Sequence, residues 1–155
     1  MSGIELCEAA AEGDFNTVRE LIHDEGVDVN ATDESNWTAL HNAAYVGDEE
    51  ILMFLLAQDD IDVNATDNSG TTPFMNVALS GNIEAVKLLL SHPKIKITLK
   101  DNRGQMAVDY AKKRGVKDVT KLVRKETSIA MKMMKGAKRL SQGARRLSQR
   151  LSRRR

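Results

Sequence analysis

The sequence predicts an all-α fold: a stack of repeated helix–turn–helix units followed by a basic extension. Glycines recur every 34 residues, at Gly13, Gly47, Gly81 and Gly115. Apolar residues occupy fixed columns around each glycine, seven positions before it and eight after it. Self-similarity at this period is typical of solenoids, in which each unit buries its apolar face only against its neighbours. Such stacks present binding surfaces more often than reaction centres.

Each unit is expected to contain two helices and an extended loop, as the second unit illustrates. Thr38 is placed to cap the first helix through its hydroxyl, and the small residues Ala43 and Ala44 allow close helix approach. Gly47 is expected to end this helix in a left-handed conformation. The second helix carries an apolar stripe at helical spacing: Ile51, Leu52, Leu55 and Leu56.

The motifs that recur are TALHNAAYVGD at Thr38–Asp48, TTPFMNVALSGN at Thr71–Asn82, and the loops VDVNATD at Val27–Asp33 and IDVNATD at Ile61–Asp67. They resemble the ankyrin repeat family over four units, about residues 4–125. The resemblance implies paired antiparallel helices with projecting loops, no cofactor, and a binding role for the loop tips and the concave helix face. His41, in the histidine column of the motif, is expected to make a structural hydrogen bond.

The terminal units depart from the motif, which suggests where the stack ends. Lys112 replaces an alanine column in the fourth unit, and Thr120 and Arg124 replace apolar residues of its second helix. A terminal repeat needs such a polar outer face. We therefore predict a repeat domain, residues 1–125, with units at about 1–32, 33–66, 67–100 and 101–125, and a separate tail, residues 126–155.

The family pattern places a set of side chains on the partner-facing surface. They are Glu34, Ser35, Trp37, Asn42, Tyr45, Val46, Asn68, Ser69, Thr71, Asn76, Leu79, Asn102, Arg103, Tyr110 and Arg114. Trp37 and Tyr45 stand out because aromatic residues concentrate binding energy in interfaces. The alternative is that Trp37 packs on the neighbouring loop and Tyr45 covers helix stems. Glu8, Glu12 and Glu34 would border this surface, so a basic partner segment is the first hypothesis.

Charge is distributed unevenly along the chain. Residues 1–84 hold 18 acidic residues and one basic residue, a net charge of −17. Residues 85–125 hold 12 basic and three acidic residues, and residues 126–155 hold ten and one, so that each segment carries +9. Opposite poles of this size steer partners over about 8–10 Å at ordinary salt.

The composition predicts no metal site, no cofactor and no enzyme. No spacing of His, Cys and acidic residues matches a zinc or catalytic pattern, and there is no phosphate-binding glycine loop or nucleophile elbow. The single Cys7 suits a reducing compartment, and no apolar run has the length of a membrane span. A monomer in the cytoplasm or nucleus is expected.

The tail has a shorter repeat, with RLSQ at Arg139–Gln142 and again at Arg146–Gln149. Helical spacing puts its apolar anchors on one face, among them Met133, Leu140, Leu147 and Leu151. The tail is therefore expected to be either an amphipathic helix or, because Gly136 and Gly143 each cost a helix roughly 1 kcal/mol, disordered when free and helical on contact.

Several roles for the tail remain open at this stage. It is suited to an acidic membrane surface or to the groove of a calmodulin-like protein, and less to nucleic acid, since no aromatic residue is interleaved for stacking. It is also compatible with a solubility tail or with one that folds back on the acidic repeats. Basic residues precede three serines that resemble kinase substrates: Ser141, Ser148 and Ser152.

The sequence thus supports two hypotheses for function. In the first, the chain is a non-catalytic adaptor or inhibitor that binds a protein partner through the repeats. In the second, it is a peripheral membrane or calmodulin-regulated protein whose basic tail is the main functional element, switched by phosphorylation.

Overall fold

The computed structural model describes residues 2–152, apart from the side chains of residues 2, 147, 148 and 150–152. Eight helices occupy this part of the chain: α1 (Ser2–Glu12), α2 (Phe15–His23), α3 (Ala39–Val46), α4 (Glu49–Leu56), α5 (Pro73–Ser80), α6 (Ile83–Ser91), α7 (Ala107–Arg114) and α8 (Lys117–Ser152).

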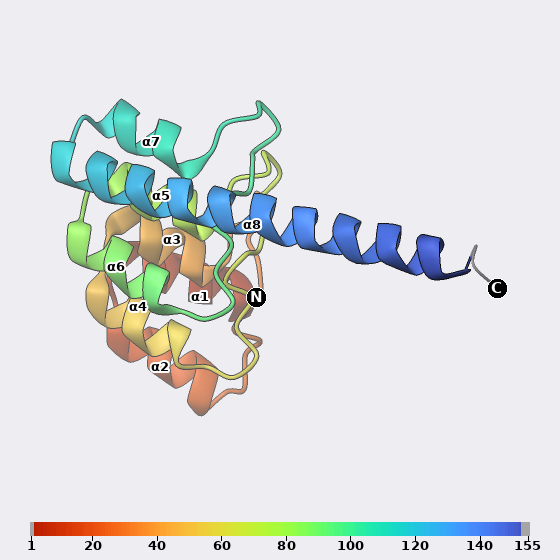
Figure 1. The fold of residues 1–155 in the computed structure, drawn as a ribbon. Helices are drawn as coiled ribbons and strands as arrows, with labels where there is room; N and C mark the ends of the chain where they lie inside the picture. Colours follow the sequence, from red (N-terminus) through yellow and green to blue (C-terminus); the bar gives the residue numbers. More distant parts are fainter. Residues whose placement is uncertain (1, 153–155) are drawn as a thin grey trace.

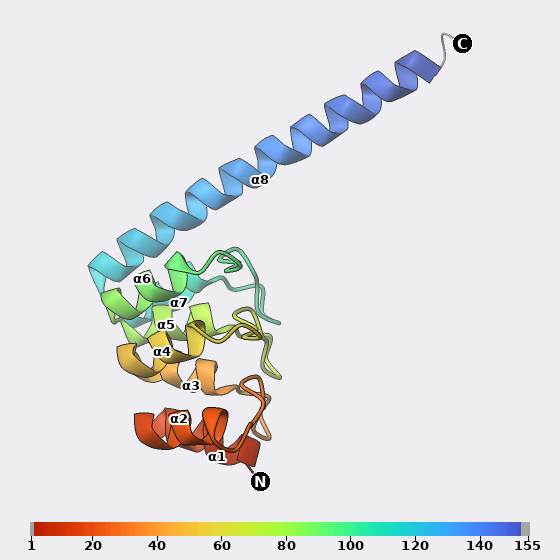
Figure 2. The same cartoon turned by 90° about the horizontal axis from the view of Figure 1, so that it is seen from below.

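The helices form two layers, and extended loops project from one end of each pair (Figure 1). The first helices of successive units, α1, α3, α5 and α7, pack side by side, and α2, α4 and α6 form the second layer. Figure 2 shows the units following one another from α1 to α8. The predicted all-α solenoid is confirmed.

Polar side chains begin the helices as the sequence predicts. The Oγ1 atoms of Thr38 and Thr72 accept hydrogen bonds from N–H groups three residues later, and Pro73 occupies the first turn of α5. Asp48 caps α4 through a 3.0 Å bond from the Ile51 N–H. Each cap satisfies a backbone donor that has no partner within the helix.

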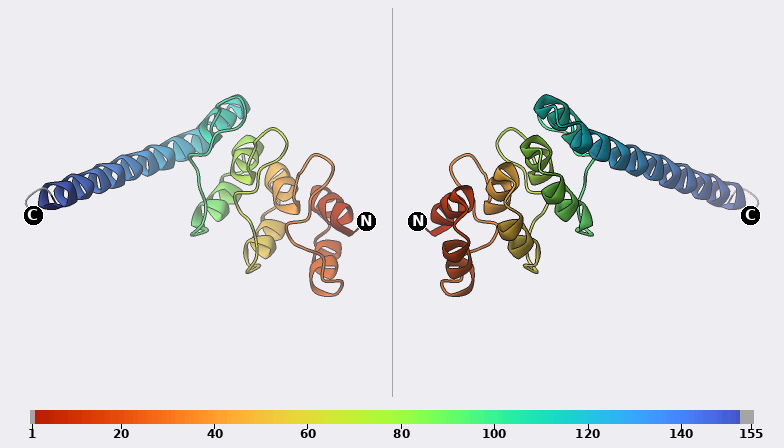
Figure 3. Two further views of the ribbon diagram at one scale, coloured as in Figure 1. Left: turned by 90° about the vertical axis from the view of Figure 1, so that its right-hand side faces the viewer. Right: turned by 90° about the vertical axis from the view of Figure 1, so that its left-hand side faces the viewer.

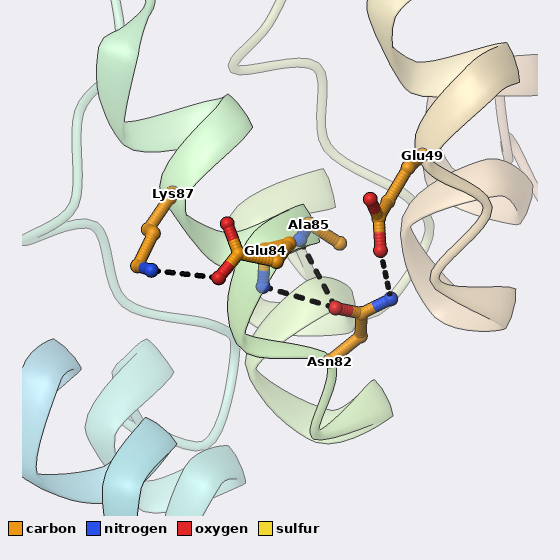
Figure 4. Close-up of polar contacts among 5 residues, drawn as sticks. All are labelled: Glu49, Asn82, Glu84, Ala85 and Lys87. Carbon is orange, nitrogen blue, oxygen red and sulfur yellow. Dashed lines mark hydrogen bonds and ion pairs between the residues drawn. The ribbon is translucent and has the colours of Figure 1, made fainter.

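The cap of α6 also joins two units (Figure 4). Asn82 Oδ1 accepts hydrogen bonds from the N–H groups of Glu84 and Ala85, at 3.0 and 3.2 Å. Asn82 Nδ2 donates to Glu49 Oε1 at 3.0 Å, so the start of α6 is tied to the start of α4. The neighbouring Glu84–Lys87 ion pair is exposed, and such pairs contribute little to stability.

An aspartate column closes the projecting loops. Asp33, Asp67 and Asp101 each accept hydrogen bonds through Oδ1 from the N–H groups two and four residues later, at 2.7–2.9 Å. The carboxylate therefore holds each loop in a tight turn through bonds that are local to that loop.

One continuous core runs through the four units. Its columns are the apolar positions that the repeat predicts: Leu6, Leu40, Phe74 and Val108 from the first helices, and Leu21, Leu55, Leu89 and Val123 from the second. Burial of these columns between neighbours, at roughly 25 cal/mol per Å² of apolar surface, is the main force that holds the stack together.

α8 continues from the last repeat into the tail. The predicted division between residues 125 and 126 falls inside this helix, and of the two alternatives for the tail the structure has the helix, which continues through Gly136 and Gly143. The physical reason lies at its start, where Val119 and Val123 are buried against the stack. Once packing has formed the first turns, each further residue adds a hydrogen bond without a new nucleation cost. The division into domain and tail remains a prediction.

The glycine column gives a test of the repeat geometry. Gly81 and Gly115 end α5 and α7 with φ of 81° and 79°, a region that costs a residue with a side chain about 1–2 kcal/mol. A Cβ on Gly81 would also lie 3.0 Å from Val116 Cγ2, whereas one on Gly115 would meet nothing within 4 Å.

We expect Gly115→Ala to lower the free energy of unfolding by about 1–2 kcal/mol and Gly81→Ala to lower it further. Urea unfolding of both variants checks this order. Equal losses would mean that contact with the next unit adds nothing at Gly81.

Candidate partner-binding surface

A groove opens between the first two units, with a cavity volume of about 490 Å³. It is lined by α1, by the loop before α3 and by α3: Ile4, Cys7, Glu8, Ala11, Asp33, Glu34, Ser35 and Asn42. Three of these residues, Glu34, Ser35 and Asn42, are predicted partner contacts. Three lining side chains are carboxylates and none is basic, so the groove has an acidic wall.

An apolar pair adjoins this groove on α3. Tyr45 and Val46 are 51% and 52% exposed, and they follow the groove residue Asn42 by three and four positions. Residues at these spacings share one side of a helix. The groove and the apolar pair therefore form one surface, called here the α1/α3 surface.

Trp37 links this surface to the next unit. Its Nε1 donates a 2.9 Å hydrogen bond to Asp67 Oδ2, and its ring lies 6.0 Å from the His41 ring and 5.7 Å from the Tyr45 ring. Trp37 is half-buried. Of the two alternatives for this residue, the structure supports packing on the neighbouring loop, while Tyr45 keeps an open face.

His41 makes the structural hydrogen bonds expected of it. Its Nε2 lies 3.0 Å from the Thr71 carbonyl oxygen, and its Nδ1 accepts from the Thr38 N–H at 3.2 Å. The carbonyl only accepts and the amide only donates, so the proton is assigned to Nε2. Burial lowers the pKa of His41, which favours this neutral form. The histidine thereby joins the second and third units.

Two of the predicted surface residues are buried, and this part of the prediction is wrong. Thr71 is 7% exposed and Asn76 is 2% exposed. Asn76 Nδ2 donates to the His41 carbonyl at 3.4 Å, and the Thr71 carbonyl faces the His41 ring. Both residues lie at the contact between the second and third units, where a partner has no access.

The predicted loop-tip residues are exposed, and backbone hydrogen bonds join the tips along the stack. The Asn68 N–H donates to the Ser35 carbonyl at 3.2 Å, and the Asn102 N–H donates to the Ser69 carbonyl at 2.9 Å. Arg103, in the last of these loops, is also exposed. The tips therefore form a connected polar edge.

Three further candidates lie on or near α5 and α7. Leu79 is half-buried and Arg114 is exposed. Tyr110 is half-buried, and its hydroxyl donates to Asp101 Oδ2 at 2.7 Å, which fixes α7 to the loop that precedes it. Burial raises the pKa of Tyr110, so this phenol stays protonated and able to donate.

Sequence reasoning missed Ile4, Cys7, Ala11 and Asp33 as groove residues. The 34-residue repeat could have identified the α1 side of the groove. Ala11 occupies the same repeat position as Tyr45, and Glu8 the same position as Asn42. Extending the partner-facing columns back into the first unit would have found the α1 side of the groove.

The tail anchors Met133 and Leu140 are exposed on α8, at 70% and 77%. Ser141 is also exposed, and its hydroxyl donates to the Lys138 carbonyl at 2.9 Å. The other predicted tail positions fall outside the side chains that the structure describes: Leu147, Ser148, Leu151 and Ser152.

Residues 6–101 match the family model described as ankyrin repeats (3 copies). The chain belongs to the ankyrin repeat family. The helix pair of α7 and α8 extends the ankyrin stack beyond the matched range. Ankyrin repeats generally mediate protein–protein interactions.

One curated relative shares a short stretch with this ankyrin-repeat chain. Over 36 residues the chain is 58% identical to the palmitoyltransferase akr1 of Schizosaccharomyces pombe. The stretch covers 23% of this chain and 6% of that protein, which is about the length of one repeat. The similarity therefore concerns a repeat.

The buried histidine predicts a dependence of stability on pH. The pKa of His41 is lower in the folded chain than in the unfolded chain, so the unfolded state takes up a proton first as the pH falls below about 6.5. The contribution of neutral His41 to stability is thus complete above that pH and is lost below it.

We expect the wild-type chain to unfold at lower urea concentration at pH 5 than at pH 7. His41→Asn should lower stability at pH 7 by about 1–3 kcal/mol, because a buried carbonyl loses its donor, and should reduce the difference between the two pH values. His23→Gln, at an exposed position, is the matched control. An unchanged difference in His41→Asn would contradict the assignment.

Cys7 lies on the groove wall but is expected to be unreactive. Burial, and next the nearby charge of Asp33, raise its pKa to about 11, and its thiol donates to the Trp37 carbonyl at 3.2 Å. At pH 8 a thiol with this pKa contains roughly a hundredfold less thiolate than an ordinary one. Disulfide-exchange reagents should therefore modify the native chain far more slowly than the urea-unfolded chain. Equal rates would show that the thiol is accessible from the groove.

Proposed function

We propose that this ankyrin-repeat chain is a non-catalytic adaptor or inhibitor that binds a protein partner through the α1/α3 surface. The observation that carries the proposal is the exposed pair Tyr45 and Val46 beside an acidic groove. Interfaces concentrate binding energy in aromatic anchors at the edge of such hollows, with polar groups around them.

The chemistry of the surface selects the kind of partner. Glu8, Asp33 and Glu34 line the groove without a basic neighbour, so a segment with lysine or arginine side chains complements it. The net charge of −17 over residues 1–84 extends this attraction beyond the groove and would speed the encounter. An apolar side chain next to the basic ones would pack on Tyr45.

The groove offers little for catalysis. Its cysteine, Cys7, is buried, the pKa of this thiol is raised to about 11, and the thiol donates to the Trp37 carbonyl. A catalytic thiol needs the opposite environment, with a lowered pKa and an adjacent base. These features support a binding role.

Binding is tested by truncating the exposed aromatic. The partner is first recovered with the intact chain and purified, and its affinity is then measured by titration calorimetry. We expect Tyr45→Ala to weaken binding by about 30-fold or more, the range of an interface hot spot near 2 kcal/mol, while urea unfolding stays close to wild type. Met53→Ala is the matched control, since Met53 is similarly exposed on α4 in the other layer. Equal weakening by both variants would contradict the proposed surface.

A second pair of variants separates the groove from overall charge. Glu8→Lys with Glu34→Lys reverses two groove charges, and Glu25→Lys with Glu50→Lys makes the same change of net charge at exposed positions outside the groove. We expect the first pair to lose most of the binding and the second pair to slow association only. Equal losses would assign the effect to the general field of the protein.

A further inference from the structure

The second half of α8 extends away from the ankyrin stack (Figure 3). Its first turns pack on α7 and contact α5 and α6, with Val119, Val123 and Thr127 buried. Every described side chain from Lys132 to Arg146 is exposed. Apart from the contact of Met134 with Thr98, the surface of this part of the helix is therefore open to a partner.

One side of the open helix is apolar. Ile129, Met133 and Leu140 are separated by four and seven residues, so they follow one stripe of the helix, and all three are exposed. Ala137 and Ala144 adjoin the stripe, and the same spacing continues in the sequence at Leu147. An exposed apolar stripe of this length on a polar protein marks an interaction surface.

A second stripe of the same helix is basic. It begins at the stack and continues to the open end at spacings of three, four, seven or eight residues, which keep one side of a helix: Lys117, Lys121, Arg124, Lys132, Lys135, Arg139 and Arg146. No acidic residue occurs after Glu126. Among the described residues, the stripe has no ion pair that would neutralise it.

Two shallow grooves border the basic stripe where it leaves the stack. The first has a volume of about 630 Å³, and its basic lining residues are Lys112, Lys117, Lys121, Arg124 and Lys125. The second, of about 320 Å³, continues along α8 past Lys132 and Lys135 and shares Arg124 and Ser128 with the first. Cationic hollows of this kind suit the anionic oxygens of lipid headgroups.

The end of the repeat array explains why these grooves exist. Lys112 occupies the column of Ala44 and Ala78, and Thr120 the column of the buried Leu52 and Val86. In the inner units these columns pack against the following unit. At the fourth unit the same columns are polar or basic, so the last face of the stack joins the basic stripe of α8.

We propose that α8 lies along the surface of an anionic lipid bilayer. Its apolar stripe enters the boundary between headgroups and acyl chains, and its basic stripe and the two grooves contact the headgroups. Among the described helices none is both long and apolar enough to cross a bilayer, so α8 rests on the membrane. At 36 residues the helix is about 54 Å long. An extended surface such as a bilayer contacts a helix of this length along its whole length.

The observations favour a membrane over the other acidic partners. The phosphates of nucleic acid would neutralise the basic residues but would leave Met133 and Leu140 exposed. A protein that wraps a basic helix would take only the open part of α8, from Lys132 onward, and would leave the basic lining of the first groove without a partner. A planar anionic surface contacts both the stack end and the open helix at once.

The experiment measures co-flotation of the full chain with vesicles. Phosphatidylcholine vesicles are compared with vesicles that contain about one-third phosphatidylserine, at low and high salt. We expect binding to the anionic vesicles only, weakened by salt. Absence of binding to phosphatidylserine vesicles, with or without retention of calcium–calmodulin or duplex RNA, would overturn the proposal.

Three sets of variants test the two stripes. Lys132→Gln, Lys135→Gln and Arg139→Gln together should weaken partitioning by roughly a hundredfold, because each basic residue near the surface contributes about 1 kcal/mol. Lys87→Gln, Lys94→Gln and Lys96→Gln remove the same charge from exposed positions outside α8, and should retain binding within about threefold. Equal losses in the two sets would show that only net charge matters, and the proposal would fail.

Met133→Ser with Leu140→Ser leaves the charge unchanged and should weaken partitioning at least about tenfold, since two apolar side chains no longer enter the bilayer. Circular dichroism is the control that checks whether each variant keeps its helix content. Wild-type partitioning of the serine pair would mean a purely electrostatic attachment and would overturn the proposed insertion.

Discussion

Asparagine side chains that bridge successive loops set the register on which the rest of the stack depends. Asn30 donates to the Asp60 carbonyl at 2.7 Å and accepts from the Asp62 N–H at 2.8 Å. Asn64, one repeat later, makes the same pair of bonds to Lys94 and Lys96. A unit shifted by one residue would leave these groups unpaired and would turn its apolar columns away from the core. The 34-residue period is therefore a spatial constraint as well as a sequence pattern.

The same column shows how the array ends. After Asn30 and Asn64 the next position is Thr98, whose hydroxyl lies 3.6 Å from the Met134 sulfur of α8. At Thr98, α8 occupies the position that the loop of a further unit would occupy. The direction of α8 is thus fixed by the repeat frame at Thr98 as well as by Val119 and Val123 in the core. An ordinary second helix becomes an extended arm because its start is packed and its remainder is not.

The sequence predicted the features that are the same in every unit. It did not predict the features that depend on the adjacent unit. Capping threonines, left-handed glycines and apolar columns follow from local chemistry that is the same in each unit, so they were predicted. Asn42 and Asn76 share a column, yet Asn42 lines the groove beside α1 and Asn76 is buried against His41. The 34-residue repeat gives the position of a residue within its unit. It does not give how deeply the adjacent unit buries that side chain. The sequence left both a helix and a disordered tail open after residue 125 for a related reason, since glycine propensity describes an isolated helix and not one whose first turns are packed.

The two proposed surfaces lie at opposite ends of the stack, and their charges do not cancel within one molecule. The acidic groove lies between the first two units, whereas the basic stripe begins at the fourth. The helix that carries this stripe, α8, leads away from the stack (Figure 2). Because α8 is anchored on α7, its basic residues do not fold back onto the acidic repeats. The stack separates the acidic groove from the basic stripe by more than the distance over which charges interact at ordinary salt, about 8–10 Å. The two proposed partners, a basic segment at the groove and an anionic surface along α8, are therefore compatible in the same complex, in which the intervening repeats would separate them.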